Sequence, residues 1–179
     1  AVFDAAKIHT AGTSYQVSAS NPWVTDAQSA ALNISSGSAY QLGFGTEPGG
    51  AAGGHLFGTQ PVVAIQDIYG NTVSSASAVA VTITLTPGTG TSGAMLSGTD
   101  RVWTDPINAA FTDLSVNRVG MDYTLTASAP GYVSGVSAPF TMTGVGKTTS
   151  NSLHGMDAVT SVDRWAVGNS GTIVATSNG

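Results

Sequence analysis

The sequence predicts an all-β protein, and three observations support this prediction. Apolar and polar residues alternate with period two in most ordered-looking stretches, and no stretch of about ten residues or more shows the 3.6-residue period of a helix. These stretches are rich in β-branched and aromatic residues, which favour strands. Turn signals separate them at short intervals over about 100 residues, a spacing that fits a two-sheet sandwich.

The expected strands alternate with turns that contain Gly, Pro, Asn or Asp. In chain order the strands are 40–44, 62–66, 78–86, 109–116, 122–127 and 138–143. The turn signals are Pro48-Gly49-Gly50, the run 67–71, Pro87-Gly88, Asp105-Pro106 and Pro130-Gly131. Together they divide the centre of the chain into the short strands of a sandwich.

An internal repeat sets the predicted domain boundaries. Residues 1–35 align without a gap with residues 109–143, at a constant offset of 108. Identities and apolar exchanges fall at inward positions and turns: Phe3/Phe111, Ile8/Val116, Gly12/Gly120, Tyr15/Tyr123, Val17/Leu125, Ala19/Ala127, Pro22/Pro130, Ala30/Ala138 and Leu32/Phe140. We therefore expect 1–36 to be the last three strands of one sandwich, 37–144 a complete copy, and 145–179 a different segment.

The N-terminal copy is expected to be incomplete by itself. Three strands bury a face only against a second sheet, and residues 1–36 do not include the strands that would supply that sheet. We expect the chain to be a segment of a longer tandem protein, or to be completed by neighbouring copies in an assembly. Strand complementation between subunits is one form that such completion would take.

The composition excludes several classes of function. Five Lys plus Arg residues are spread along 179 residues, so no basic patch is expected to bind nucleic acid. No apolar run approaches the roughly 18 to 20 residues of a membrane span. The chain is rich in Ser, Thr and Gly, with two Lys, one Glu and no Cys. This composition, with a net charge of −5, predicts an extracellular or cell-surface location.

One run of the complete copy resembles a known family. Residues 61–73 form an apolar strand followed by the pattern Asp67-x-x-Gly70-Asn71-x-Val73. This run, with 110–116 and 120–127 as closing strands, resembles the bacterial Ig-like repeats of the invasin/intimin kind. The resemblance covers 38–143 and, in truncated form, 1–35. It implies an Ig-like β-sandwich and a tandem rod that holds something away from a cell surface.

The turn residues of this motif have a structural interpretation and a metal-binding alternative. Gly70 and Asn71 suit a turn with positive φ, and Asp67 can accept hydrogen bonds from the amides of the turn. Tyr123 after Gly120, and Tyr15 after Gly12, stand where an Ig-like tyrosine corner would be. As an alternative, Asp67, Asp113 and Asp122 would bind Ca²⁺. We favour the turn chemistry, because Ca²⁺ loops usually concentrate several carboxylates within about a dozen residues.

The C-terminal segment resembles a different kind of repeat. Residues 152–159 and 164–179, with the motif Trp165-Ala-Val-Gly-x-x-Gly-Thr-Ile, resemble one blade of a photosystem II assembly-factor-like or BNR-like β-propeller. The expected element is a β-hairpin with Asn169-Ser170-Gly171 as its turn. Alternatively, this hairpin packs on the sandwich or pairs with the open edge of a neighbour.

The sequence offers no catalytic constellation. His9, His55 and His154 do not share metal-ligand spacing. The glycine-rich run 49–58 lacks the Lys-Ser/Thr of a phosphate loop, so we expect this run to be a flexible connector. Asp100 and Asp105 flank Trp103, which could form a sugar platform with acids. We expect this stretch to be an exposed edge strand instead. We therefore predict that the chain is not an enzyme and needs no cofactor.

We expect a structural segment of a large extracellular, surface or filament-forming protein. Its partners would be neighbouring Ig-like domains or copies of itself. One alternative is an adhesin module that binds a host protein or glycan through Trp23, Trp103 and Tyr132. Packing at an inter-domain joint is a second interpretation of Trp23 and Tyr132. A further alternative is an accessory domain of a secreted carbohydrate-active enzyme.

Overall fold

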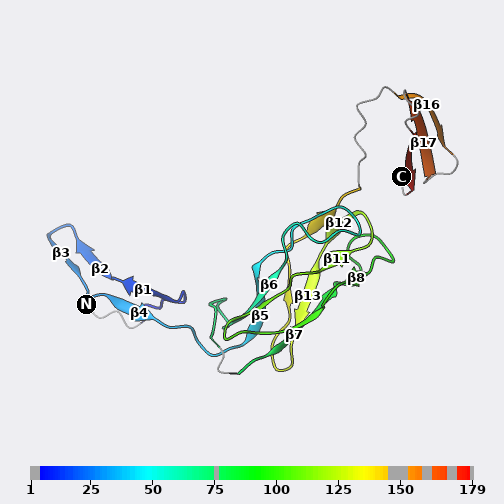
Figure 1. The fold of residues 1–179 in the computed structure, drawn as a ribbon. Helices are drawn as coiled ribbons and strands as arrows, with labels where there is room; N and C mark the ends of the chain where they lie inside the picture. The colour runs from blue at the N-terminus through cyan, green and yellow to red at the C-terminus, as the bar shows by residue number, and fades with distance from the viewer. Residues whose placement is uncertain (1–4, 75–76, 145–152, 159–162, 169–172, 178–179) are drawn as a thin grey trace. The chain divides into compact units, whose positions relative to one another are not determined.

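The computed structural model describes residues 5–74, 77–144, 153–158, 163–168 and 173–177. All the regular elements in these residues are β-strands, so the predicted all-β class is confirmed. The chain divides into two compact units, Ala1–Thr143 and Gly144–Gly179, and each is described separately. Figure 1 labels most of the strands in chain order.

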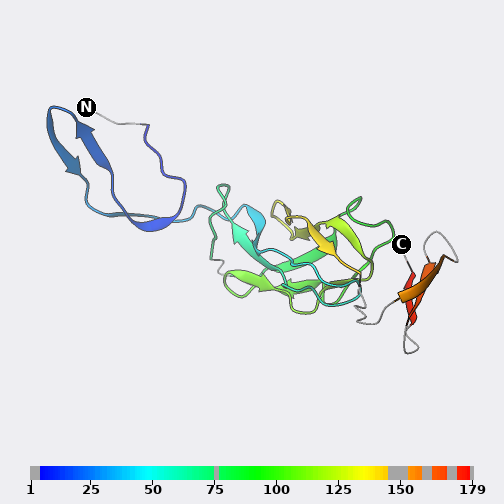
Figure 2. The ribbon, with the colours of Figure 1, turned by 90° about the horizontal axis from the view of Figure 1, so that it is seen from above.

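The N-terminal part of the first unit contains four short strands rather than the three expected. They are β1 (Gly12–Tyr15), β2 (Ser18–Asn21), β3 (Val24–Gln28) and β4 (Leu32–Ile34). β1 pairs with β4, and β2 pairs with β3, in two separate antiparallel pairs (Figure 2). The second of the expected strands, the equivalent of 122–127, is divided between β1 and β2, because the β1–β4 register shifts between Gly12 and Tyr15, where Ser14 has a φ of 62°. Such an irregularity turns the strand and lets β2 take another partner.

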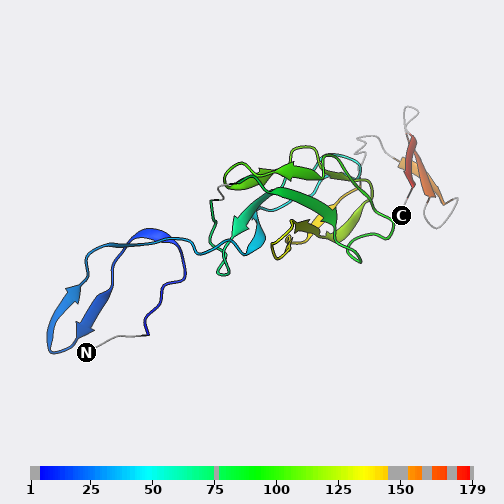
Figure 3. The ribbon, with the colours of Figure 1, turned by 90° about the horizontal axis from the view of Figure 1, so that it is seen from below.

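The remainder of the first unit contains two larger sheets. One has the order β10-β6-β5 and the other the order β14-β13-β7-β9, while β8 pairs with β11 and β12 pairs with β15 (Figures 1 and 3). The strands are β5 (Gln41–Thr46), β6 (Val62–Gln66), β7 (Ala80–Leu85), β8 (Leu96–Ser97), β9 (Arg101–Trp103), β10 (Asn108–Ala110), β11 (Ser115–Val116), β12 (Gly120–Tyr123), β13 (Leu125–Ser128), β14 (Gly135–Val136) and β15 (Phe140–Met142).

Apolar side chains from both larger sheets share one core, which makes this part of the chain sandwich-like. Alternate residues of β6, β7 and β13 point into it, as period-two strands require. The buried members are Leu42, Phe57, Val63, Ile65, Val81, Ile83, Ala109, Phe111, Leu114, Val116, Tyr123, Leu125, Ala127, Phe140 and Met142. Burial of this apolar surface is the main force that holds the sheets together.

Two of the expected strands are interrupted in the structure. The run 109–116 is divided between β10 and β11, because Asp113 turns the chain and accepts hydrogen bonds from the amide and hydroxyl of Thr99. The run 122–127 is divided between β12 and β13, and Asp122 has a φ of 60°. In 122–127 the buried residues Tyr123, Leu125 and Ala127 keep the period of two across the break, so the pattern does not reveal it. In 109–116 the step from Phe111 to Leu114 is three positions, so the alternation changes phase at the break.

The structure repeats the 108-residue offset in its strand pairing. Gly12 pairs with Ile34 and Tyr15 with Leu32, and the residues 108 positions later pair in the same way, Gly120 with Met142 and Tyr123 with Phe140. The hairpins also correspond: the pairs are Ser18/Gln28 and Ala19/Ala27 in one, and Thr126/Val136 and Ala127/Gly135 in the other. The two residues with positive φ other than glycine in the described part of the chain, Ser14 and Asp122, are also 108 apart.

The hydrogen bonds beside these hairpins repeat as well. The hydroxyl of Ser29 accepts from the amide of Val17 and donates to the carbonyl of Ala30. The hydroxyl of Ser137 does the same for Leu125 and Ala138. Residues 12–34 and 120–142 therefore share one backbone structure, although their side chains differ at most positions.

The second unit contains a three-stranded antiparallel sheet. Its order is β16-β17-β18, with β16 at Leu153–Ala158, β17 at Asp163–Gly168 and β18 at Ile173–Ser177. Trp165 of the expected blade motif stands opposite Asp157 on one side and Ala175 on the other. The expected turn at 169–171 lies outside the described residues.

Candidate functional site

Asp67 is the best-connected polar residue of the predicted turn. It follows β6 directly and its side chain is 2% exposed. One carboxylate oxygen accepts from the amides of Tyr69 and Asn71, both at 2.9 Å. The other accepts from the amide of Gly37 and from the side-chain nitrogen of Asn71, both at 2.8 Å. The carboxylate thus joins its own turn to the segment that precedes β5.

These donors change the acidity of the group. Burial by itself raises the pKa of the Asp67 carboxyl, but the hydrogen bonds from Asn71, Gly37 and Tyr69 outweigh it and lower the pKa from 3.8 to about 2. Asp67 is therefore ionised at all physiological pH values, and its charge is balanced by hydrogen-bond donors.

A glycine at position 70 is required by the backbone conformation and not by a lack of room for a side chain. Its φ is 85°, and an added Cβ would meet no atom within 4 Å. A side chain there would be strained only by the left-handed conformation. The structure therefore places Gly70 at the positive-φ position of the Asp67 turn.

Asn71 connects this turn to the N-terminal part of the chain. Its side-chain oxygen accepts from the amide of Ala11 at 2.8 Å, and its side-chain nitrogen donates to the carbonyl of His9 at 2.7 Å. The rings of His9 and Tyr69 lie 4.2 Å apart between centroids. We call this set of contacts, made by His9, Ala11, Gly37, Asp67, Tyr69 and Asn71, the joint.

The sequence predicted only part of the joint. Asp67 and Asn71 stand out as turn residues, but His9 and Ala11 contribute backbone atoms, which any residue at those positions would offer. The partners are also about 60 residues apart, beyond the reach of local pattern analysis. The stacking of His9 on Tyr69 carried no signal in the sequence.

The two predicted corner tyrosines differ in their surroundings. Tyr123 is fully buried and its hydroxyl donates to the carbonyl of Arg118 at 3.1 Å. A Cβ on Gly120 would lie 3.0 Å from the Tyr123 hydroxyl, and a Cβ on Gly12 would lie 3.0 Å from that of Tyr15. Tyr15 is nevertheless only half-buried. The local geometry is therefore shared, while the apolar environment is not.

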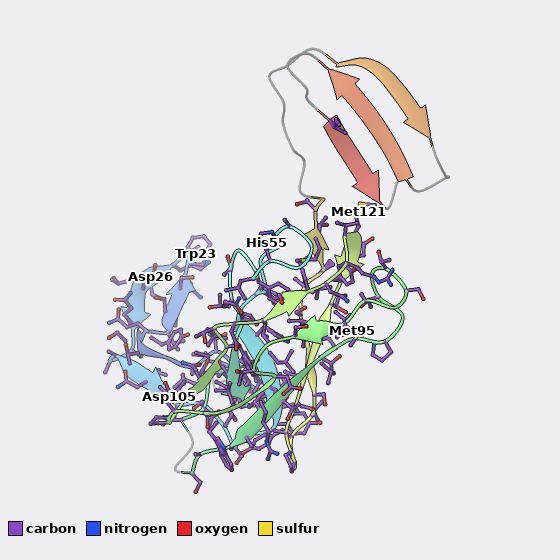
Figure 4. The ribbon with its side chains drawn as sticks, turned by 45° about the vertical axis from the view of Figure 1, so that its right-hand side comes forward. Trp23, Asp26, His55, Met95, Asp105 and Met121 are labelled. Atoms are coloured by element: carbon purple, nitrogen blue, oxygen red, sulfur yellow. The ribbon has the colours of Figure 1, made fainter. Side chains whose placement is uncertain are left out.

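The three aromatic residues proposed as an interaction surface lie on three separate elements. Trp23 is 88% exposed in the turn between β2 and β3, where Figure 4 labels it. Trp103 is 62% exposed at the end of β9, the edge strand of its sheet, in agreement with the edge position expected from the sequence. Tyr132 is partly buried and packs against the core. Tyr132 is thus a packing residue, and the two tryptophans are the exposed members.

The carboxylate of Asp105 bonds its own loop, and that of Asp113 bonds Thr99 in the loop between β8 and β9. Asp105 accepts from the amides of Ile107 and Asn108, and these hydrogen bonds lower the pKa of its carboxyl. The hydrogen bonds from Thr99 lower the pKa of Asp113 in the same way. Within the described residues no group of three or more His, Asp or Glu side chains is arranged to hold a metal ion.

The glycine-rich run 49–58 is more constrained than a flexible connector. Gly49, Gly53 and Gly54 donate hydrogen bonds to the carbonyls of Thr59, Thr143 and Val116, respectively. Phe57 within the run is buried in the core. The small residues permit close backbone contact, because a Cβ on Gly50 would overlap the carbonyl oxygen of Thr141. The expectation of flexibility was therefore wrong for this run.

Comparisons with known proteins do not assign a family. The sequence matches no protein-family model and no curated protein. None of the described residues forms a helix that is both long and apolar enough to cross a membrane.

Proposed function

We propose that this chain is a structural, non-enzymatic segment of an extracellular, surface or filament-forming protein built from tandem Ig-like sandwiches. The observation that supports this most strongly is the repeat of strand register, positive φ and hydrogen bonding at an offset of 108 residues. A backbone repeated in series is the expected product of tandem domains. The buried Tyr123, whose hydroxyl reaches the backbone upstream, is in keeping with an Ig-like tyrosine corner.

The contacts of the joint also support a structural role. A flexible linker would need no specific contacts, but Asn71 bonds both His9 and Ala11, and Asp67 bonds Gly37. In this proposal these hydrogen bonds favour one orientation between successive repeats. Neighbouring Ig-like domains are therefore the partners that this proposal assigns.

Adhesion through Trp23 and Trp103 is the second candidate. Its supporting observation is the exposure of both indole rings, since exposed aromatic side chains are frequent contact residues. A glycan or protein array tests it: binding that is lost in Trp23→Ala or Trp103→Ala supports adhesion. Unchanged binding of the double variant argues against it.

Labelling of the native material tests the structural proposal. Electron microscopy with an antibody against residues 37–144 should show regularly spaced label on filaments or on a cell surface. Label confined to dispersed soluble particles would contradict the proposal.

Distance measurements test the joint directly, because the chain has no native cysteine to interfere. Spin labels on Thr25→Cys and Ser134→Cys, both at exposed positions, should give one narrow distance distribution. Asn71→Ala should broaden it. Asn117→Ala, which removes a similar Asn-to-backbone bond within the sandwich, is the matched control and should leave it narrow. Equal distributions in all three would refute a specified joint.

A further inference from the structure

The outer edge of β2 is the feature that the proposed function leaves unused. In the complete copy, the corresponding strand β13 lies between β14 and β7. Leu125 pairs there with Leu85, and Ala127 pairs with Ile83. β2 has β3 as its one ladder partner among the described residues. Its other edge corresponds to the side of β13 on which β7 lies.

Apolar side chains of this region are exposed at positions whose equivalents in the complete copy are buried. Val17 is 53% exposed, whereas its equivalent Leu125 is fully buried. Ala19 is exposed, and its equivalent Ala127 is fully buried. The same two positions are therefore covered by a second sheet in the complete copy and uncovered in residues 12–34.

We infer that residues 12–34 are an acceptor for the opening strands of another repeat, a segment with the pattern of residues 37–108. This inference rests on the proposed tandem architecture, because the occupant is another repeat of the same kind. A β7-like strand pairs antiparallel with the free edge of β2. It places the position of Leu85 opposite Val17 and the position of Ile83 opposite Ala19. Addition of a strand to an open edge satisfies its backbone groups and buries its apolar side chains.

Besides the β7-like ladder, the complete copy shows two further sets of contacts that the same occupant would make. The first set, which is the second attachment, joins residues 40–42 to Val133. The amide of Val133 donates to the carbonyl of Tyr40, and the amide of Leu42 donates to the carbonyl of Val133. The equivalent of Val133 is Thr25 in β3. The occupant therefore contacts both strands of the β2–β3 hairpin, through a β7-like strand and a β5-like strand.

A glutamate supplies the third attachment. Glu47, which follows β5, accepts from the amide of Ala138 at 2.8 Å. The equivalent of Ala138 is Ala30. A segment patterned like 37–108 thus reaches residues 17–20, 25 and 30 together. Contacts at all of these positions form together in one register only, so they select this occupant over an unrelated apolar strand.

A fusion chain tests the inference. Residues 37–108 are placed directly before residue 1 of the full chain, so that Asn108 is followed by Ala1, the equivalent of Ala109. We expect the amides of Ser18 and Ser20, which face the open edge because those of Val17 and Ala19 face β3, to exchange with solvent at least about 100-fold more slowly than in the unfused chain. Ile83→Asp in the added segment alone is the matched control and should abolish this protection. Unchanged exchange in a fusion whose added segment is folded by circular dichroism overturns the inference.

A peptide provides a second measurement if the fusion does not fold. The peptide of residues 78–87, with two lysines at each end for solubility, is added to the unmodified chain, and the same peptide with Ile83→Asp is the control. Saturable slowing of amide exchange at Ser18 and Ser20, absent with the control peptide and in a Val17→Asp chain, supports the acceptor. If the fusion is unfolded and the peptide gives no slowing, the acceptor is overturned.

These outcomes separate the acceptor from the proposed function. Labelled filaments without protection in the fusion would leave the tandem architecture standing and remove the acceptor. Protection in the fusion without filaments or surface label would support the acceptor and contradict the filament or surface location in the proposed function.

Discussion

Residues 12–34 and 120–142 share a backbone but not an environment. Strand register, positive φ and the serine hydrogen bonds recur at an offset of 108, yet Leu125 is fully buried and Val17 is half exposed. The local conformation is thus specified by turn residues and short-range pairing. Stability, by contrast, depends on the sheet that covers the apolar face. The comparison separates what the chain encodes locally from what it requires of a partner.

The largest expected difference between the two copies concerns the buried leucine. Leu125→Ala should lower the free energy of unfolding by about 3 kcal/mol, because it leaves a cavity in the core. Val17→Ala should change it by less than about 0.5 kcal/mol, since that side chain is half exposed. Equilibrium urea unfolding of the full chain measures both. Equal losses would show that the N-terminal copy has a closed core of its own.

The shared positive φ gives the next effect. Asp122→Val should lower the stability by about 1 to 2 kcal/mol, because a β-branched residue tolerates the left-handed region poorly. Asp122→Gly is the control and should be nearly neutral. Ser14→Val should leave the unfolding of the sandwich unchanged and instead speed amide exchange in β1 and β4. A similar loss of sandwich stability for both valine variants would contradict the separation of the copies.

The tyrosine hydroxyls provide a smaller contrast. Tyr123→Phe removes the hydrogen bond to the carbonyl of Arg118 and should lower the stability by about 1 kcal/mol. Tyr15→Phe should have no measurable effect, because Tyr15 is half-buried and water can replace any partner. Thermal unfolding of the two variants beside the parent chain measures this contrast. A larger effect at Tyr15 would reverse our assignment of the buried corner.

The last effect is confined to acid. Because the pKa of Asp67 is lowered from 3.8 to about 2 in the folded chain, its contribution is complete above pH 3.8 and is lost as the pH falls through 2. Asp67→Asn should flatten the fall in stability across this interval. Asp26→Asn, an exposed change in β3, should not. Parallel pH profiles for the parent and Asp67→Asn would show that the carboxylate is not held by the joint.

The sequence predicted those features that repeat or alternate. The run 62–66 matches β6, and residues that the 108-residue alignment makes equivalent occupy equivalent positions in the two hairpins. The division of 109–116 was missed, although the step from buried Phe111 to buried Leu114 is three positions instead of two and marks the interruption at Asp113. The candidate turn was placed correctly for Asp67 and Gly70, but the positive φ expected at Asn71 was wrong, because Asn71 acts in the turn through its side-chain hydrogen bonds. Its contacts with His9 and Ala11 were not predicted, since they join backbone atoms about 60 residues away.

The joint has a mechanical consequence. Gly37 lies between β4 and β5, so tension applied along the chain reaches the sandwich through the segment that Asp67 holds. The few side-chain bonds of Asp67 and Asn71 should yield before the ladder between β5 and β6 does, because that ladder shares the load among more hydrogen bonds. The joint would then be a reversibly extensible element: it opens under tension while the core stays folded, and it re-forms when the tension is released.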